Sequence, residues 1–209
     1  MISEKVNINI FNQWAQKGKD KGMEKGHAAS VYEMLEIIKK RSNILQNNFS
    51  FLDLGCGNGW VVKKFSNNNI CDLSVGVDGA ENMIDKAKIN DSIGQYFQSN
   101  IESWNTKDKF DIVFSMETFY YLKNPNIVLS KIYNNFLKNK GMLIIGIDHY
   151  FENKPSLSWE NEIGIQTQTL SINDWKDLFR ENNFKDIEHI QVGKKDDWSG
   201  TLIISAFKN

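Results

Sequence analysis

The stretch SFLDLGCGNG, residues 50–59, decides the fold of this chain. Its apolar start is typical of a short buried strand, and its glycine-rich end leads into a helix expected over residues 59–66. Three alternate glycines, Gly55, Gly57 and Gly59, are more than a simple tight turn needs. Because glycine lets the backbone turn sharply and come close to a ligand, we interpret the loop as a binding loop.

Strands and helices continue to alternate along the chain. The spacing of apolar residues predicts further helices over residues 80–90, from Asn124 with Pro125 at its first position, and from Ser171. Residues 193–199, between the last two strands, show no helical pattern and have the length of a hairpin connection. The expected strands are 50–55, 73–78, 94–99, 110–115, 141–148, 186–192 and 200–207.

This order of elements predicts the fold class. Strands that alternate with helices form a parallel sheet with helices on both faces. We therefore expect an α/β fold: a Rossmann-like, doubly wound, mostly parallel seven-stranded sheet with an antiparallel C-terminal β-hairpin. Ligands bind to such sheets at the carboxyl ends of the strands.

The length of 209 residues fits a single domain, 1–209. Within it we expect N-terminal helices or a lid (1–48), a cofactor-binding core (49–148) and a substrate loop with the C-terminal hairpin (149–209). No internal repeat or proline-rich linker divides the chain.

The N-terminal part contains an irregular segment, residues 15–30. It holds Gly18, Gly22 and Gly26, and each glycine inside a helix costs about 1 kcal/mol relative to alanine. We therefore expect this segment to be a mobile loop between two helices.

The composition excludes several classes of protein. The net charge of −1, from 25 basic and 26 acidic residues, provides no strong field to attract nucleic acid or an anionic membrane. Two cysteines, Cys56 and Cys71, are too few for a disulfide framework or a metal cluster. The first residues lack the pattern of a signal peptide, and no apolar stretch approaches the ~20 residues of a membrane span. We expect a cytoplasmic protein.

Asp78 ends the second expected strand, in VGVDGA. An acidic side chain there can accept two hydrogen bonds from a ribose diol, or it can cap the helix that follows. Its position about 20 residues after the glycine loop favours a nucleoside ligand. The dinucleotide fingerprint G-x-G-x-x-G fails, because Trp60 stands where its last glycine belongs, and a P-loop lacks its Gly-Lys-Ser/Thr.

Three segments in the same order carry a family resemblance. DLGCGNG (53–59), VGVDGAENM (75–83) and FDIVFSMETFYYL (110–122) resemble the class I S-adenosylmethionine-dependent methyltransferases, and the match extends over roughly residues 50–148. The resemblance implies S-adenosyl-L-methionine as cofactor and S-adenosyl-L-homocysteine as product. The Asp/Asn-Pro-Pro-aromatic motif of DNA-amino methyltransferases is missing from the sequence, which argues against DNA as a partner.

The resemblance also implies roles for single residues. Gly55 and Gly57 would approach the amino-acid part of the cofactor, Asp53 would reach its ammonium, and Asp78 would hold both ribose hydroxyls. Asn100 stands where the family commonly has an acid near the adenine. The other residues implied to border the cofactor are Cys56, Gly79, Met83, Ile101, Ser115 and Met116.

The acceptor side is less defined. His149 follows the fifth expected strand and is the best candidate for a catalytic base, although an ordinary polar loop residue is an equal alternative. The long connection 149–170, together with the N-terminal helices, is expected to shape the acceptor pocket. The candidate substrate-binding residues are Tyr120, Tyr121, Tyr150, Trp159 and His27.

We therefore expect methyl transfer to a small-molecule acceptor by in-line displacement, without a metal, by a monomer or homodimer. Two alternatives remain open. One is a non-catalytic S-adenosylmethionine-binding sensor or activating partner subunit, which would bind the cofactor without turnover. The other, less favoured because of Trp60, is a nicotinamide-dependent dehydrogenase.

Overall fold

In the computed structural model, which describes residues 2–209 and the side chains from residue 6 onward, seven strands form one sheet. Their order is β3-β2-β1-β4-β5-β7-β6. The strands are β1 (Phe49–Leu54), β2 (Cys71–Asp78), β3 (Gln95–Gln98), β4 (Phe110–Met116), β5 (Leu137–Ile147), β6 (Lys185–Val192) and β7 (Thr201–Phe207).

Neighbouring strands run parallel except at β7, which is antiparallel to both β5 and β6. The chain moves outward from β1 to β3, then returns to place β4 on the other side of β1. This reversal opens a crevice at the carboxyl ends of β1 and β4, where sheets of this type bind ligands. The predicted mostly parallel sheet with an antiparallel C-terminal hairpin is confirmed.

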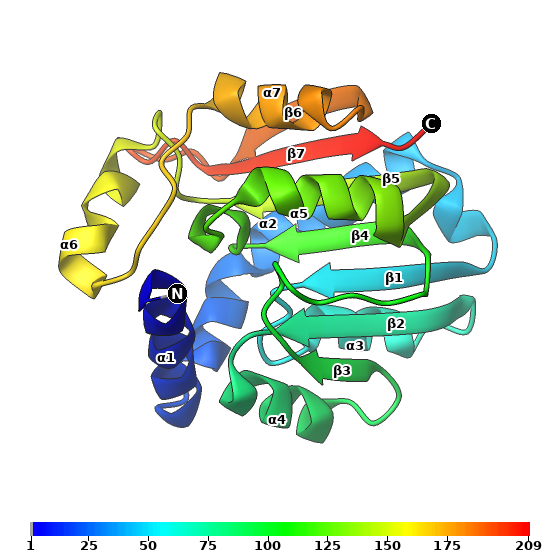
Figure 1. Ribbon diagram of the computed structural model, residues 1–209, viewed down its shortest axis with the longest axis horizontal. Helices are drawn as coiled ribbons and strands as arrows, with labels where there is room; N and C mark the ends of the chain where they lie inside the picture. Colours follow the sequence, from blue (N-terminus) through cyan, green and yellow to red (C-terminus); the bar gives the residue numbers. More distant parts are fainter. Residues whose placement is uncertain (1) are drawn as a thin grey trace.

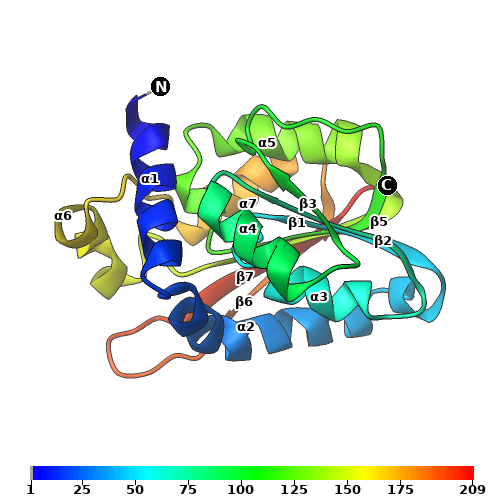
Figure 2. The same cartoon turned by 90° about the horizontal axis from the view of Figure 1, so that it is seen from below.

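Helices cover both faces of the sheet. Figure 2 shows α2 and α3 on one face and α5 and α7 on the other. Within residues 2–209 no helix combines the length and the apolar character needed to cross a membrane. The helices are α1 (Ile2–Gln16), α2 (Asp20–Arg41), α3 (Trp60–Ser66), α4 (Glu81–Asn90), α5 (Pro125–Lys131), α6 (Trp159–Ile163) and α7 (Ile172–Glu181), with short turns η1 (Ile44–Gln46), η2 (Phe119–Tyr121), η3 (Ile132–Phe136) and η4 (Lys154–Ser158).

The central strands are buried on both sides. On β4, Ile112 and Phe114 pack in the hydrophobic cluster that includes α2 and α3, whereas Val113 between them packs in the cluster that includes α7. Successive strand residues point to opposite faces, so a strand covered on both faces must be apolar throughout. This explains the uninterrupted apolar runs in the sequence.

Two predicted helix starts are confirmed in detail. The Asn124 side chain accepts a hydrogen bond from the backbone N–H of Ile127 at 3.2 Å, with Pro125 in the first turn. At α7, Ser171 and Asp174 form a reciprocal capping box.

The expectation of a mobile loop over residues 15–30 is wrong. Helix α1 continues to Gln16 and α2 starts at Asp20, so Gly22 and Gly26 lie inside a helix. The Asp20 carboxylate, only 4% exposed, accepts hydrogen bonds from Lys86 and Asn58. Such tertiary contacts outweigh a propensity cost of about 1 kcal/mol per glycine.

Replacing these glycines tests the helical assignment. Gly22 and Gly26 have open space where a Cβ would be added, so Gly22→Ala and Gly26→Ala should each raise the free energy of unfolding by about 0.5–1 kcal/mol. Gly18 also faces open space but has φ +72° in the turn, so Gly18→Ala should destabilise the protein. Urea unfolding measures all three. Equal effects at the three positions would contradict the assignment.

Candidate functional site

The carboxyl ends of the parallel strands meet at one edge of the sheet. Figure 1 shows the arrowheads of β1, β2 and β4 directed toward α1. A cavity lies at this edge, lined by residues that follow β1, β2, β3 and β4 and by one side each of α1 and α2. It is the place where the fold is expected to bind a ligand.

The glycine loop forms one wall of this cavity. Gly55 has φ +85°, and a Cβ added there would lie 1.9 Å from Thr118 Oγ1, so only glycine fits against the segment after β4. Gly57 has φ +52° but faces open space, and it lines the cavity. The loop is held to β2 because the backbone N–H groups of Gly55 and Cys56 donate to the Val77 carbonyl, at 2.7 and 3.1 Å.

Asp78 connects the loop to the next helix. Its Oδ2 accepts the backbone N–H of Gly57 at 2.9 Å, and its Oδ1 accepts that of Ala80 at 2.8 Å. Burial raises the pKa of Asp78, and these two backbone donors oppose the rise. The Asp78 carboxylate therefore holds the glycine loop and the residue that precedes α4 in a fixed relation, and Asp78 also lines the cavity.

Asp53, at the end of β1, is an unsatisfied buried acceptor. It is 3% exposed, and its Oδ1 has no hydrogen-bond partner among the described atoms. Burial, and then the nearby charge of Asp78, raise its pKa. Because a buried carboxylate needs a donor or a cation, this end of the cavity fits a ligand that carries an ammonium group.

The cavity gathers most of the residues predicted to border the cofactor. It is lined by Asp53, Gly55, Cys56, Gly57, Asp78, Gly79, Met83, Asn100, Ile101 and Met116. Ser115 does not line it: its hydroxyl is buried and donates to the Leu54 carbonyl at 2.6 Å, which ties β4 to β1.

Helix α1 covers the cavity. The Ile8 side chain lies over Gly79, where an added Cβ would come within 2.9 Å of it. Asn7 exchanges two hydrogen bonds with the main chain of Gln166, at 2.8 and 2.9 Å. Phe11 packs edge-on against Tyr121, with 5.1 Å between the ring centroids. The helix thus joins the glycine side of the cavity to the segment after α6.

Sequence reasoning expected N-terminal helices or a lid but did not name the residues of α1 that cover the cavity, nor several other lining residues. On α1 and α2 the apolar positions were indistinguishable from ordinary core residues, whereas Glu117, an acid directly after an apolar strand, was a signal that could have been followed. The missed residues that line the cavity are Asn7, Ile8, Phe11, Asp20, Met23, Glu24, Asn58, Trp60, Val61, Ala80, Glu117, Thr118 and Leu122.

His27, predicted to bind substrate, does line the cavity and lies near two carboxyl groups. Its Nε2 is 3.9 Å from Asp148 Oδ2, and single ligand atoms of His27, Asp148 and Glu117 all lie within 4.8 Å of one another. Burial lowers the pKa of His27, and Asp148 opposes this. Burial also raises the pKa values of Glu117 and Asp148.

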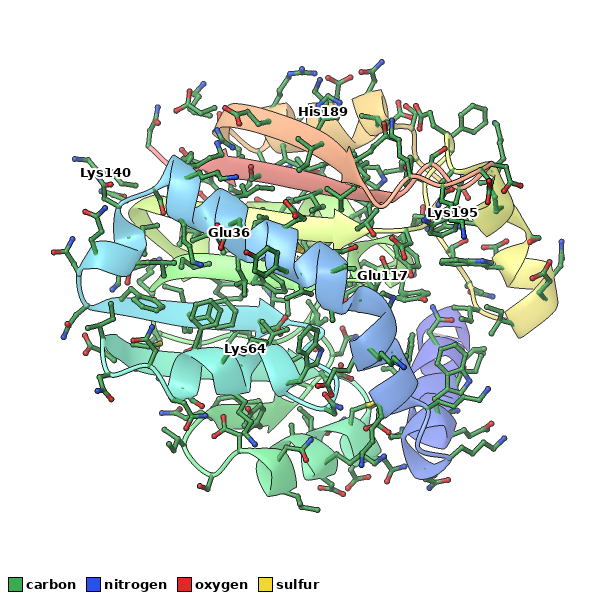
Figure 3. All side chains as sticks on the ribbon, turned by 180° about the vertical axis from the view of Figure 1, so that it is seen from behind. Glu36, Lys64, Glu117, Lys140, His189 and Lys195 are labelled. Carbon is green, nitrogen blue, oxygen red and sulfur yellow. The ribbon has the colours of Figure 1, made fainter. Side chains whose placement is uncertain are left out.

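The two predicted tyrosines have different positions. Tyr121 lines the cavity, whereas Tyr120 is fully buried behind it. The Tyr120 hydroxyl lies 2.6 Å from Glu117 Oε2, to which it donates, and 2.9 Å from the Tyr121 hydroxyl. Figure 3 shows Glu117 beside α2 at this end of the sheet, with His189 well away from it on β6. His189 is therefore remote from the cavity.

His149 is not brought into the cavity, and the prediction of a base at this position needs correction. Its ring is 1% exposed, with Nδ1 2.9 Å from the Ser156 carbonyl and Nε2 2.7 Å from Thr169 Oγ1. Burial lowers its pKa. With both nitrogens engaged, His149 fastens the connection after β5 and has no free position for an acceptor proton.

Tyr150 and Trp159 also serve that connection and lie outside the cavity lining. The fully buried Tyr150 donates its hydroxyl to the Gly200 carbonyl at 2.8 Å. Trp159 stacks on Trp198, with ring centroids 6.2 Å apart. The structure therefore does not place either side chain against a ligand.

A second cavity adjoins the first. It shares Asn7, Tyr121 and Leu122 with it, and its other lining residues are Lys123, Glu160 and residues 166–168. The segment after α6 and helix α1 thus line a space next to the first cavity. The sequence predicted that these two parts of the chain shape the acceptor pocket.

Comparison with known proteins decides the family. Residues 25–189 match the model of the methyltransferase domain. The chain belongs to the methyltransferase-domain family. The predicted class, with S-adenosylmethionine as cofactor, is confirmed at this level, and two solved neighbours contain S-adenosylhomocysteine.

One curated relative of this chain is malonyl-[acyl-carrier protein] O-methyltransferase 2 of Ilyobacter polytropus. It is 29% identical over 136 residues, which are 61% of this chain and 52% of that protein. (S)-coclaurine N-methyltransferase of Papaver somniferum is 27% identical over 117 residues, 54% of this chain and 33% of that protein. The chain thus spans about half the length of the first relative and a third of the second.

The methyltransferase fold is also shared with solved structures. A chain from the complex of the Haloferax volcanii Trm112 methyltransferase activator with a methyltransferase superposes with a TM-score of 0.80. That match covers 94% of this chain and 96% of the other, at 24% identity. It confirms the Rossmann-like methyltransferase fold.

The role of His149 in this methyltransferase-family chain can be measured. His149→Ala should lower the free energy of unfolding by about 2–4 kcal/mol, because it leaves two buried groups unpaired and opens a cavity, while the affinity for S-adenosylhomocysteine stays unchanged. His189→Ala, an exposed histidine on β6, is the control and should change stability little. A stable His149→Ala variant with lost turnover would contradict the structural role.

The pH dependence follows from the lowered pKa of His149. The unfolded chain, with an ordinary value of 6.5, takes up a proton more readily than the folded one, so His149 contributes stability above pH 6.5 that is lost as the pH falls toward its folded pKa. The stability difference between wild type and His149→Ala should therefore shrink below pH 6.5 in urea unfolding experiments. A difference that is constant with pH would contradict the lowered pKa.

Proposed function

We propose that this protein transfers the methyl group of S-adenosylmethionine to a small-molecule acceptor. The observation that carries the proposal is the convergence in one cavity of the glycine loop, the unpartnered Asp53 carboxylate and the loop-fixing Asp78. When bound, the cofactor supplies a methyl group already activated on a sulfonium. The protein then has to bind, align and shield the reactants, and alignment provides much of the rate.

Each part of the cofactor has candidate partners in the cavity. Asp53 would accept hydrogen bonds from the cofactor's ammonium group. Asp78 would hold the ribose while it fixes the glycine loop at Gly57, which faces open space. Apolar side chains near the ends of β2 and β3, Met83 and Ile101, would enclose the adenine. These roles are the ones that the family resemblance implies.

A small acceptor is supported by the space that adjoins the first cavity. The second cavity lies between α1 and residues 166–168, next to Tyr121. The curated relatives are named for malonyl-[acyl-carrier protein] and for coclaurine, so the family handles unlike acceptors on one cofactor site. Helix α1, which is hydrogen-bonded to Gln166, would shield the reacting groups from water.

Calorimetry tests the proposal and separates it from the alternatives. S-adenosylmethionine and S-adenosylhomocysteine should bind with micromolar affinity, and NADH, the probe for a dehydrogenase, should not bind. Methyl transfer to an acceptor would exclude a non-catalytic sensor or activating subunit. Binding of NADH in preference to both sulfur ligands would contradict the proposal.

A substitution identifies the site. Asp78→Asn should weaken S-adenosylhomocysteine binding by about 10- to 100-fold, because charge-assisted hydrogen bonds to a buried ligand are worth about 1.5–3 kcal/mol. Asp72→Asn, at the opposite end of the same strand, is the matched control: Asp72 is exposed and accepts a hydrogen bond from Asn48. Unchanged affinity in Asp78→Asn would place the cofactor elsewhere.

A further inference from the structure

The charged side chains that line the cavity are almost all acidic. Among the lining residues that the structure describes, His27 is the one basic side chain. The acids that line the cavity are Asp20, Glu24, Asp53, Asp78 and Glu117. Asp20 pairs with Lys86, whereas the other four form no ion pair with lysine or arginine within the described side chains. An anionic acceptor would be repelled here, and a cationic one attracted.

Two carboxyl groups lie apart from those that the cofactor would use. Asp53 and Asp78 lie at the ends of β1 and β2, whereas Glu117 follows β4 and Asp148 follows β5. Asp148 is only 8% exposed, and its Oδ1 has no hydrogen-bond partner among the described atoms. Glu117 Oε1 is likewise buried and unpartnered, while its Oε2 accepts from Tyr120. Two buried carboxylate oxygens, one on each residue, therefore lack a hydrogen-bond donor.

The neighbours of these oxygens do not neutralise them. His27 on α2 is the nearest base, and burial lowers its pKa. The Tyr120 hydroxyl on η2 donates to Glu117 and lies 2.9 Å from the Tyr121 hydroxyl, but neither phenol carries a positive charge. Thr201 on β7 offers a hydrogen bond to Asp148. A ligand with a positively charged donor would satisfy the two carboxyl groups. Tyr121, which also lines the second cavity, lies next to this cluster.

We propose that Glu117 and Asp148 bind the amino group of the acceptor, so that the protein methylates nitrogen. This inference rests on the proposed methyl-transfer function and names its substrate class: a small amine that enters as an ammonium ion. Glu117 Oε1 and Asp148 Oδ1 would accept its N–H groups. Carboxylic acids would add a further negative charge to the cluster, so the proposal predicts that they are not acceptors.

The same carboxyl groups serve the chemical step. The ammonium gives one proton to Glu117 Oε1, which exposes the nitrogen lone pair and removes the repulsion between two adjacent cations. The nitrogen then forms a bond to the methyl carbon as the carbon–sulfur bond breaks, and the bonding pair stays on sulfur. The products are a methylated ammonium and a thioether, and Glu117 returns its proton to water. Burial, which raises the pKa of Glu117, favours this temporary protonation.

The test is a screen of matched acceptors on the whole protein with radiolabelled S-adenosylmethionine. Primary and secondary amines are compared with the carboxylic acids and alcohols of the same carbon skeletons, and binding is followed in parallel by thermal shift with S-adenosylhomocysteine present. We expect methylation and stabilisation from members of the amine set alone. Use of an acid or an alcohol, or no use of any amine, would overturn the inference.

Variants then identify the site. Glu117→Gln and Asp148→Asn should each raise the KM for the amine at least tenfold, while the affinity for S-adenosylhomocysteine stays within about twofold. Glu162→Gln on α6, an exposed acid outside both cavities, is the matched control. An unchanged KM in both Glu117→Gln and Asp148→Asn would overturn the inference.

Metal analysis gives a further independent outcome. Glu117, Asp148 and His27 are also groups that bind metal ions, so a stoichiometric divalent metal that survives dialysis against a chelator would overturn the assignment to an amine. Loss of S-adenosylhomocysteine binding in the wild type would instead overturn the proposed function itself. Cofactor binding together with rejection of every amine overturns only this inference.

Discussion

The geometry of the site depends on one carboxylate, that of Asp78. Its two oxygens accept the backbone N–H groups of Gly57, in the loop after β1, and of Ala80, at the start of α4. Two crossover connections that leave neighbouring parallel strands are thereby held in a fixed relation. Because Asp78 also lines the cavity, the residue that fixes the loop lies next to a ligand bound there. Charge-assisted hydrogen bonds of this kind are among the stronger ones in proteins.

The rest of the site is arranged around this fixed corner. The fold places the ends of β1, β2, β3 and β4 at one edge, and α1 covers it by packing Ile8 on Gly79 and hydrogen-bonding Asn7 to Gln166. Asp53 and Asp78 line the cavity beside the glycine loop, and Glu117 lines it after β4, with Asp148 buried next to Glu117. Carboxyl groups on these separate strands would hold a cofactor and an acceptor beside each other, which in-line transfer requires.

The sequence was sufficient for the fold and for many of the residues that line the cavity at the sheet edge. Apolar runs predicted strands buried on both faces, and the glycine loop with Asp78 predicted the ligand edge, because those signals are local. The sequence was insufficient where contacts between distant residues decide the local structure or the role of a side chain. Gly22 and Gly26 are helical because Asp20 is anchored to Lys86 and Asn58, and His149 is structural because Ser156 and Thr169 engage its ring. Neither group of hydrogen-bonding partners can be recognised from a local pattern in the sequence.

Hydrogen–deuterium exchange with and without S-adenosylhomocysteine tests the central claim most directly, namely that the cofactor lies between the glycine loop and helix α1. The predicted result is slower amide exchange on ligand addition in residues 53–60 and 78–84, with accompanying protection of α1 and the first turns of α2, and unchanged exchange in β6 and β7. Protection absent from the glycine loop, or confined to another part of the chain, would contradict this account.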